Sequence, residues 1–213
     1  MKNIKRILAV FTVLVASVAL ANPVSAATFP ALNLITGSPD IESSFITVNY
    51  VGNSTSGTFT ASGFANVISP PGSPAGNIAG GTFDIFASIN ENAMTANGTL
   101  NIGGTVASLG FNSGTLLTGV LADFGAGVGD PLEFLFTVTG GDAVGLFGIQ
   151  AGVILSQSGY SGSFNGNFAS GPFQALSDTF PAPVNPVPVP AAIWLFGTAL
   201  IGLFGYSKRR KAA

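Results

Sequence analysis

The 213-residue chain contains no cysteine and no histidine, and its seven Lys and Arg residues all lie close to the two ends. Positions 7–207 contain neither Lys nor Arg. The lack of cysteine excludes disulfide bonds as a source of stability. Without His, Cys or Lys, this long central part also lacks the residues that usually act as activated nucleophiles and general bases.

Charge of either sign is scarce, and the charge of the central part is entirely negative. Charged residues make up 8% of the chain. All nine acidic residues lie between Asp40 and Asp178, so this region has a net side-chain charge of −9. Because no cation is available there to neutralise phosphate groups, nucleic acid and anionic lipid are poor partners for it. Cation binding stays open.

The N-terminus has the layout of a secretory signal peptide. A short basic stretch (2–6) precedes an apolar run (7–20), and the small residues Ala26 and Ala27 follow a helix-breaking proline. This order is typical of a segment cleaved by signal peptidase, and cleavage after Ala26 fits best, with Ala27 as the neighbouring option. The run is too short to span a bilayer comfortably, so we expect a signal peptide at 1–26 rather than an uncleaved anchor helix.

The C-terminus contains a second apolar segment. Residues 191–206 carry no charge and show no polar side, which argues against a helix of a soluble core. At ~1.5 Å per residue this segment covers roughly 24 Å as a helix, a little less than the ~30 Å hydrocarbon core. We predict a single short transmembrane helix. A cytoplasmic tail (207–213) follows, with a stop-transfer block made of Lys208, Arg209, Arg210 and Lys211.

A proline-rich stretch at 181–190 separates this helix from the rest of the chain. Five of its ten residues are proline, which prevents helix and sheet pairing and favours an extended spacer of roughly 31 Å. Its end has the sequence Val187-Pro188-Val189-Pro190-Ala191. A ligand for proline-binding modules is the alternative interpretation of the stretch.

The proline motif, the apolar helix and the basic end, in this order, resemble the PEP-CTERM protein-sorting domain. The motif is similar to the variant written VPLPA, with Val189 where leucine is common and without the acidic residue of Pro-Glu-Pro. The resemblance covers about 25 residues. It implies that an exosortase, a multi-pass membrane enzyme, recognises the tail and cuts near the motif. It also implies a Gram-negative host that makes exopolysaccharide, and a link to biofilm, floc or sheath material.

Residues 27–180 form one exported domain, large enough to bury a core. Short segments of this domain alternate apolar residues with Thr, Ser or Asn, the pattern of strands with one buried face. The expected inward residues are Ile46, Val48 and Tyr50; Phe59 and Ala61; Phe83, Ile85, Ala87 and Ile89; Leu100 and Ile102; Phe134, Phe136 and Val138; and Phe164 and Phe168.

Turn signals separate these segments. Asn97-Gly98 lies between two alternating runs and predicts a hairpin turn, because both residues tolerate positive φ. We predict an all-β fold, an antiparallel β-sandwich or jelly-roll-like domain. A β-solenoid is the alternative, although no fixed-period repeat supports it.

Carboxylates are the only candidates for chemistry in this domain. Asp123, Asp130, Glu133 and Asp142 would have to face one another across a cleft to form a glycosidase pair. With the glycine-rich loop at 125–130 they would instead form a calcium site. Solubilising acids on strand ends and loops are the ordinary interpretation.

We therefore expect a non-enzymatic exported surface or matrix protein without a cofactor, with an exosortase and extracellular polysaccharide as its partners. It would be anchored in the inner membrane before processing and released to the cell surface or outside afterwards. A carboxylate-dependent glycan-processing enzyme and a calcium-dependent adhesin are the alternatives.

Overall fold

The computed structural model describes residues 29–53, 55–127, 129, 131–162, 164, 168–169 and 175–182. The regular secondary structure of these residues is almost entirely β-strand, with a single 3₁₀ turn, η1 (Ala107–Leu109), and a one-turn helix, α2 (Val144–Phe147). The strands are β1 (Asp40–Gly52), β2 (Ser56–Ser69), β3 (Gly76–Asn77), β4 (Ala79–Asn90), β5 (Thr95–Val106), β6 (Phe111–Gly125), β7 (Leu132–Gly140), β8 (Gln150–Ser156), β9 (Phe168–Ala169) and β10 (Ala175–Pro181). The expectation of an all-β fold is confirmed.

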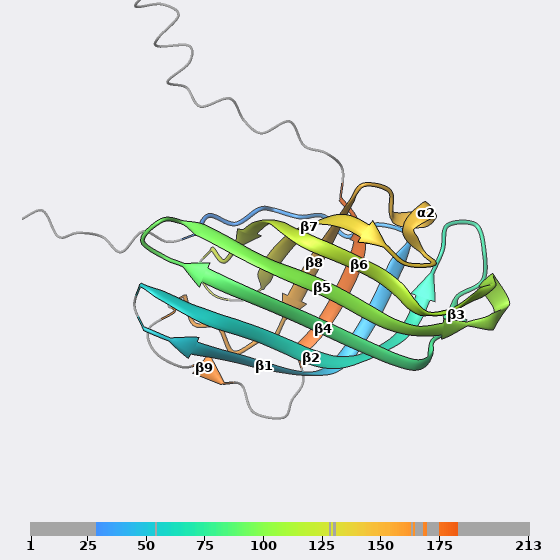
Figure 1. The fold of residues 1–213 in the computed structure, drawn as a ribbon, viewed down its shortest axis with the longest axis horizontal. Coiled ribbons are helices and arrows are strands. Elements are labelled where there is room, and N and C mark those ends of the chain that lie inside the picture. Colours follow the sequence, from blue (N-terminus) through green and yellow to red (C-terminus); the bar gives the residue numbers. More distant parts are fainter. Residues whose placement is uncertain are drawn as a thin grey trace, which may run out of the picture.

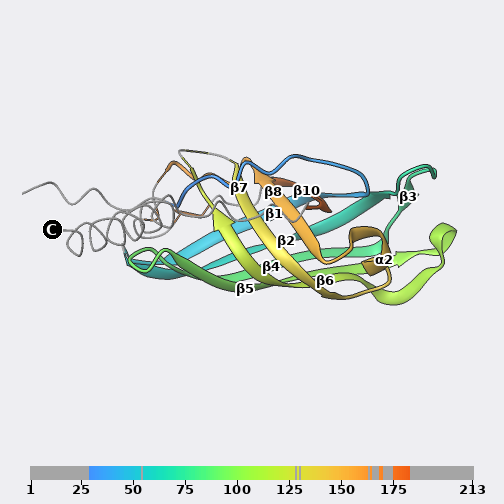
Figure 2. The same ribbon diagram turned by 90° about the horizontal axis from the view of Figure 1, so that it is seen from above.

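Eight of these strands form a closed antiparallel ring. The order around the ring is β2, β4, β5, β6, β7, β8, β10 and β1, and β1 pairs back with β2. The two-residue strands β3 and β9 pair with β2 and β1 outside this ring. In Figure 1, β2, β4 and β5 form the near side, and β8 and β10 pass behind them. Seen from above, the ring is elongated and flattened (Figure 2).

The prediction of a β-sandwich or jelly roll is wrong, because a sandwich consists of two separate sheets and this sheet closes on itself as a barrel. Closure requires strands that bend sharply, and bulges supply the bends. The pairing of β1 with β2 shifts register between Glu42 and Ser43 and again between Ser44 and Thr47. Residue Phe45, within the second shift, has a left-handed φ of 51°.

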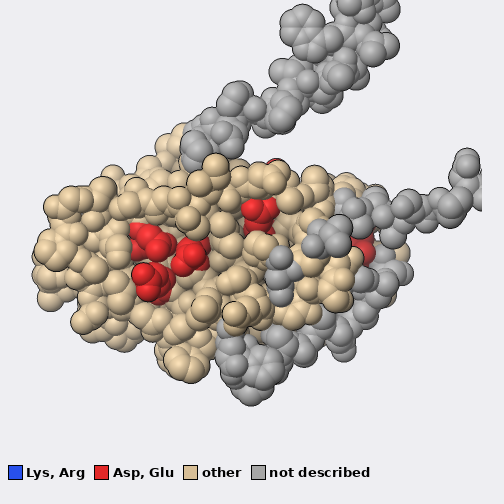
Figure 3. Space-filling view, turned by 180° about the vertical axis from the view of Figure 1, so that it is seen from behind, with Lys and Arg blue, Asp and Glu red and all other residues tan. Residues whose placement is uncertain are grey.

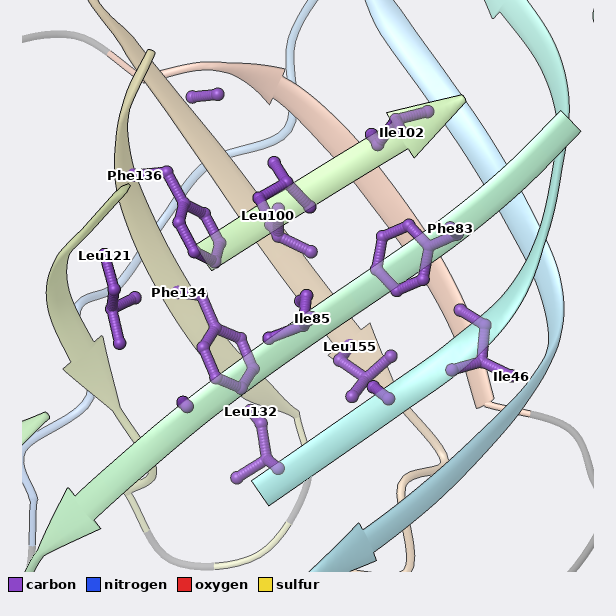
Figure 4. Packing of buried hydrophobic residues seen from close by; sticks show 14 of the residues in the cluster. Ile46, Phe83, Ile85, Leu100, Ile102, Leu121, Leu132, Phe134, Phe136 and Leu155 are labelled. Atoms are coloured by element: carbon purple, nitrogen blue, oxygen red, sulfur yellow. The ribbon is translucent and has the colours of Figure 1, made fainter. Parts of the chain in front are cut away.

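Aromatic side chains fill the interior of the barrel. Phe59, Phe83, Phe134 and Phe136 are fully buried, as the alternation predicts. Phe134 lies centrally, with ring centroids 5.2 Å from Phe59 and 6.2 Å from Phe136. Figure 4 shows Phe134 and Phe136 among aliphatic side chains from neighbouring strands. The barrel therefore has a packed core of the kind that stabilises a domain without disulfides.

The hairpin predicted at Asn97-Gly98 is wrong. Both residues lie within β5, where Gly98 pairs with Ala87 of β4. The turn falls earlier, at residues 91–94, where the Asn90 side chain accepts a hydrogen bond from the Ala93 N–H at 2.9 Å. Gly98 serves packing instead, because a Cβ there would overlap the main-chain carbonyl oxygen of Phe86.

Candidate functional site

A broad polar surface covers the outward side of β2, β4, β5, β6 and β7. Successive side chains of a strand point to opposite sides of a sheet, so the residues between the buried positions lie together on this surface. Most of them are Thr, Ser or Asn. We call this surface the outer polar face and define it by Thr58, Thr60, Ser62, Asp84, Phe86, Ser88, Asn97, Thr99, Asn101, Thr118, Val120, Thr137 and Thr139.

The strand register aligns these side chains in rows across the sheet. In the central row, Thr60 pairs with Phe86, Phe86 with Thr99, Thr99 with Val120 and Val120 with Thr137. A second row contains Ser62, Asp84, Asn101 and Thr118. Neighbouring strands are about 4.8 Å apart, so hydroxyl and amide groups recur at regular intervals in both directions.

Two apolar side chains stand exposed in the central row. Phe86 is 52% exposed and Val120 is 51% exposed, whereas Phe134 in the interior is fully buried. An aromatic ring among hydroxyl groups matches a pyranose sugar, which has an apolar C–H side and a rim of hydroxyls. The ring offers a stacking surface and the hydroxyl and amide side chains offer hydrogen bonds.

The outer polar face is nearly uncharged. Asp84 is its single acidic residue, and no described residue is basic. Acidic side chains gather elsewhere, and Figure 3 shows them in patches on the opposite side of the molecule. Asp40, Glu42 and Asp178 lie close enough together to interact there. A neutral ligand therefore fits the outer polar face better than a charged one.

The sequence itself indicates that Phe86 points outward, although the expected inward residues do not include this position. In the run 82–90, Phe83, Ile85, Ala87 and Ile89 occupy one phase, and the other phase is otherwise polar. Phe86 falls in the polar phase, and the structure places it outward. A large apolar residue that breaks the alternation of a strand is thus the mark of this position.

The structure separates Glu133 from Asp142, whereas Asp123 lies on the strand next to Glu133 and pairs with Leu135, two residues along β7. Glu133 lies near the start of β7, whereas Asp142 lies two residues beyond its end at Gly140, and the strand from Glu133 to Gly140 alone covers about 23 Å at ~3.3 Å per residue. Asp142 accepts a hydrogen bond from the Ser113 N–H at 2.8 Å, which lowers the pKa of its carboxyl. Asp123 is exposed and accepts one from the Phe124 N–H. Asp130 lies outside the described residues.

Glu133 is buried, and both of its carboxylate oxygens already accept hydrogen bonds. Its carboxylate accepts hydrogen bonds from three successive backbone N–H groups of the segment before β1. Among the described residues, no three His, Cys, Asp or Glu side chains are placed so that they could hold a metal ion. The acidic set thus forms no calcium cage within the part of the chain that the structure describes, and backbone N–H groups take up the carboxylate of Glu133.

A different acidic residue, Glu91, lies beside two tyrosines. The Tyr50 hydroxyl donates to Glu91 Oε1 at 3.5 Å, and burial together with this carboxylate raises the pKa of Tyr50 to about 12. Tyr160 also has its pKa raised to about 12, by burial and by the charge of Glu91. Both rings contact Phe164, with centroids 5.1 and 4.8 Å away. This cluster keeps its hydroxyls protonated at physiological pH and is part of the packing.

Of the predicted spacer at 181–190, the structure describes Pro181 and Ala182, and Pro181 is the last residue of β10, paired with Ala151, so the expectation that the stretch avoids sheet pairing is wrong at its first residue. The other predicted residues of the two ends lie outside the described residues. This holds for the signal cleavage site at Ala26 and Ala27, the motif at 187–191, the apolar segment at 191–206 and the basic block at 208–211. Within the described ranges, no helix has the length and apolar character needed to cross a membrane.

A comparison of the chain with protein-family models, curated proteins and solved structures finds no match.

Proposed function

We propose that the chain is a non-enzymatic exported protein of the cell surface or extracellular matrix, sorted by an exosortase and associated with exopolysaccharide. The observation that carries this proposal is the order of three elements at the C-terminus. A proline motif (187–191), an uncharged apolar segment (191–206) and a basic block (208–211) follow one another without interruption. Each element is common alone, and the combination resembles a sorting tail.

Each element has a physical role in this proposal. The signal peptide directs the barrel across the inner membrane, and the basic block stops transfer of the tail. Beyond Pro181, the proline stretch favours neither a helix nor a sheet, so it holds the motif extended just outside the membrane, where a processing enzyme reaches it. Cleavage near the motif then separates the barrel from its anchor.

The outer polar face supports extracellular polysaccharide as the partner of the released barrel. Its hydroxyl and amide groups recur across five strands, and Phe86 stands exposed in the central row. Its charge is low, which favours a neutral polymer over an acidic one. The remaining acidic residues on other parts of the surface keep the barrel soluble.

Intact mass spectrometry of the protein from the membrane and the medium of its host tests the sorting. We expect a medium species that begins at Ala27 or Thr28 and ends within 187–191. Replacing Pro188 and Pro190 by alanine should leave the uncut species in the membrane. Replacing Pro183 and Pro186, which lie in the same stretch outside the motif, is the matched control and should not. An intact tail in every fraction would overturn the exosortase assignment.

Co-sedimentation of the chain with insoluble cellulose, chitin and curdlan tests the binding. We expect at least one of these neutral polymers to retain the protein, and Phe86→Ala to weaken retention about tenfold, within the 1–3 kcal/mol of an aromatic stacking contact. Ile149→Ala removes another exposed apolar side chain, 69% exposed and outside the outer polar face, and should leave retention unchanged. Retention by none of the three, or equal loss in both variants, would remove the outer polar face as the binding surface.

A further inference from the structure

The pairing of β1 with β10 closes the barrel, and it places two acidic side chains directly opposite each other. Glu42 of β1 pairs with Asp178 of β10, on the outward side of the sheet. Like charges in directly opposed positions destabilise an antiparallel pair. No described residue is basic, so no ion pair offsets this repulsion among the residues that the structure places.

Asp40 adds a third carboxyl to the β1–β10 ladder, which we call the seam. It lies two residues before Glu42 on β1, and burial together with the charges of Asp178 and Glu42 raises its pKa to about 6. The adjacent strands contribute no titratable group, because β2 places Ser69 opposite Asp40 and β8 places Ile154 opposite Asp178. The three carboxyls therefore face one another and uncharged neighbours.

On the inward side of the seam, several buried polar groups lack hydrogen bonds. The hydroxyls of Ser43, Ser177 and Thr179 are buried and find no hydrogen-bond partner among the described residues. Together with Asp40 Oδ1 they make up the set of such buried atoms found among the described residues, and all four lie on β1 or β10. A buried polar group without a partner weakens the structure around it.

The backbone of the seam is irregular as well. The ladder shifts register between Ser43 and Ile46. The β4–β5 ladder also shifts register, between Ala79 and Thr82, and then runs regularly from Thr82, opposite Gly103, to Asn90, opposite Thr95. Repulsion, unsatisfied hydroxyls and a bulge thus coincide at one ladder of the ring.

We propose that the β1–β10 ladder is the acid-strengthened closure of the barrel: it opens first when Asp40, Glu42 and Asp178 all carry charge, and it tightens when Asp40 takes up a proton. Charged carboxyls on this ladder repel one another, and a proton on Asp40 removes one of the three charges. β10 ends at Pro181, where the proline-rich stretch begins, and it also pairs with β8, so opening would expose one edge of the strand that leads to the proposed sorting tail.

Hydrogen exchange of the full-length chain in detergent, followed by mass spectrometry at pH 7.5 and pH 5, tests this closure. After correction for intrinsic exchange rates, peptides of β10 should be protected less than peptides of β4 and β5 at pH 7.5. The difference should shrink at pH 5. Asp178→Asn should protect β10 about two- to fivefold at pH 7.5, the range of one cross-strand pair, and reduce its pH dependence.

Asp84→Asn is the matched control, because Asp84 is an outward strand acid that pairs with uncharged Ser62 and Asn101. It should leave β10 exchange unchanged. Glu42→Gln tests the same repulsion from the other strand and should reproduce the effect of Asp178→Asn. Equal protection of β10 and β4 at pH 7.5, or no gain in protection from both seam variants, would overturn the proposal.

Discussion

The carboxylate of Glu133 accepts a hydrogen bond from the Leu32 N–H at an N···Oε2 distance of 2.6 Å, although the two residues are 101 positions apart. The same carboxylate accepts from the N–H groups of Asn33 at 3.0 Å and Leu34 at 2.8 Å. Asn33 has a left-handed φ of 57°, and in such a conformation successive N–H groups converge on one anion. Glu133 thereby ties the segment before β1 to the outside of β7.

Glu133→Gln should destabilise the barrel. An amide has one acceptor oxygen and an NH₂ group that would face N–H donors, so at least one of the three charge-assisted bonds is lost. We expect the free energy of unfolding to fall by about 2 kcal/mol, measured by urea denaturation. Asp123→Asn, at an exposed residue of the neighbouring strand, should change it by less than about 0.5 kcal/mol. Equal effects of the two variants would mean that Glu133 does not anchor the segment.

Asp40 should make the barrel more stable at pH 5 than at pH 7.5. Its folded-state pKa of about 6 exceeds its ordinary value of 3.8, so the folded chain binds more protons than the unfolded chain between these values. The free energy of unfolding therefore rises as pH falls through this window, by about 1 kcal/mol once solvent screening of a half-exposed group is allowed for.

Asp40→Asn should flatten this dependence between pH 4 and 6, measured by urea denaturation at each pH. Burial also raises the pKa of Glu91, which acts in the same direction and should persist in the variant. Asp142 has a lowered pKa, so its contribution is lost only as pH falls below the ordinary range of a carboxyl. A stability that decreases steadily from pH 7.5 to pH 5 in the parent chain would contradict the prediction.

Gly98→Ala should be strongly destabilising. The added Cβ would overlap the Phe86 carbonyl oxygen and press on the Cα of Ala87, and a backbone atom cannot rotate away. We expect a loss of about 2–3 kcal/mol, typical of overpacking. Gly145→Ala is the control, because a Cβ in α2 would meet nothing within 4 Å. Melting temperatures of both variants check this, and a similar melting temperature for the two would show that the close approach is relieved elsewhere.

Phe86→Ala and Phe134→Ala should separate binding from stability. Phe134 is fully buried between other aromatic rings, so its loss should lower the free energy of unfolding by about 3–5 kcal/mol. Phe86 is half-exposed, and its truncation should cost less than about 1 kcal/mol while weakening polysaccharide retention. Urea denaturation beside co-sedimentation measures both. A large stability loss for Phe86→Ala would assign this ring to packing.

The alternation of apolar and polar residues predicts the strands and their inward sides because the side-chain period of two is a local property. Ile46, Val48, Phe83 and Phe136 are buried as expected. It does not predict which strands pair across the chain. The closure of β1 with β10 depends on residues far apart in sequence, so a sandwich and a barrel give the same pattern.

β10 itself carries the opposite of the expected pattern. Ser177 and Thr179 point inward and are buried, whereas Leu176 is 47% exposed on the outside. The role of Glu133 was equally hidden, because its donors are backbone groups about 100 positions away. The position of Phe86 could have been read from the sequence, since this residue interrupts a regular alternation. The proposed sorting function is assigned to the two ends of the chain, and it is inferred from the order of their sequence elements alone.

The return of β10 to β1 gives each of the eight long strands a neighbour on both sides. A β-rich chain with 47% hydrophobic and only 8% charged residues would otherwise present free N–H and C=O groups along an open strand. Such an edge recruits strands from other molecules and starts aggregation. Closure lets many copies of the barrel stay crowded together and still meet one another through side chains instead of backbone.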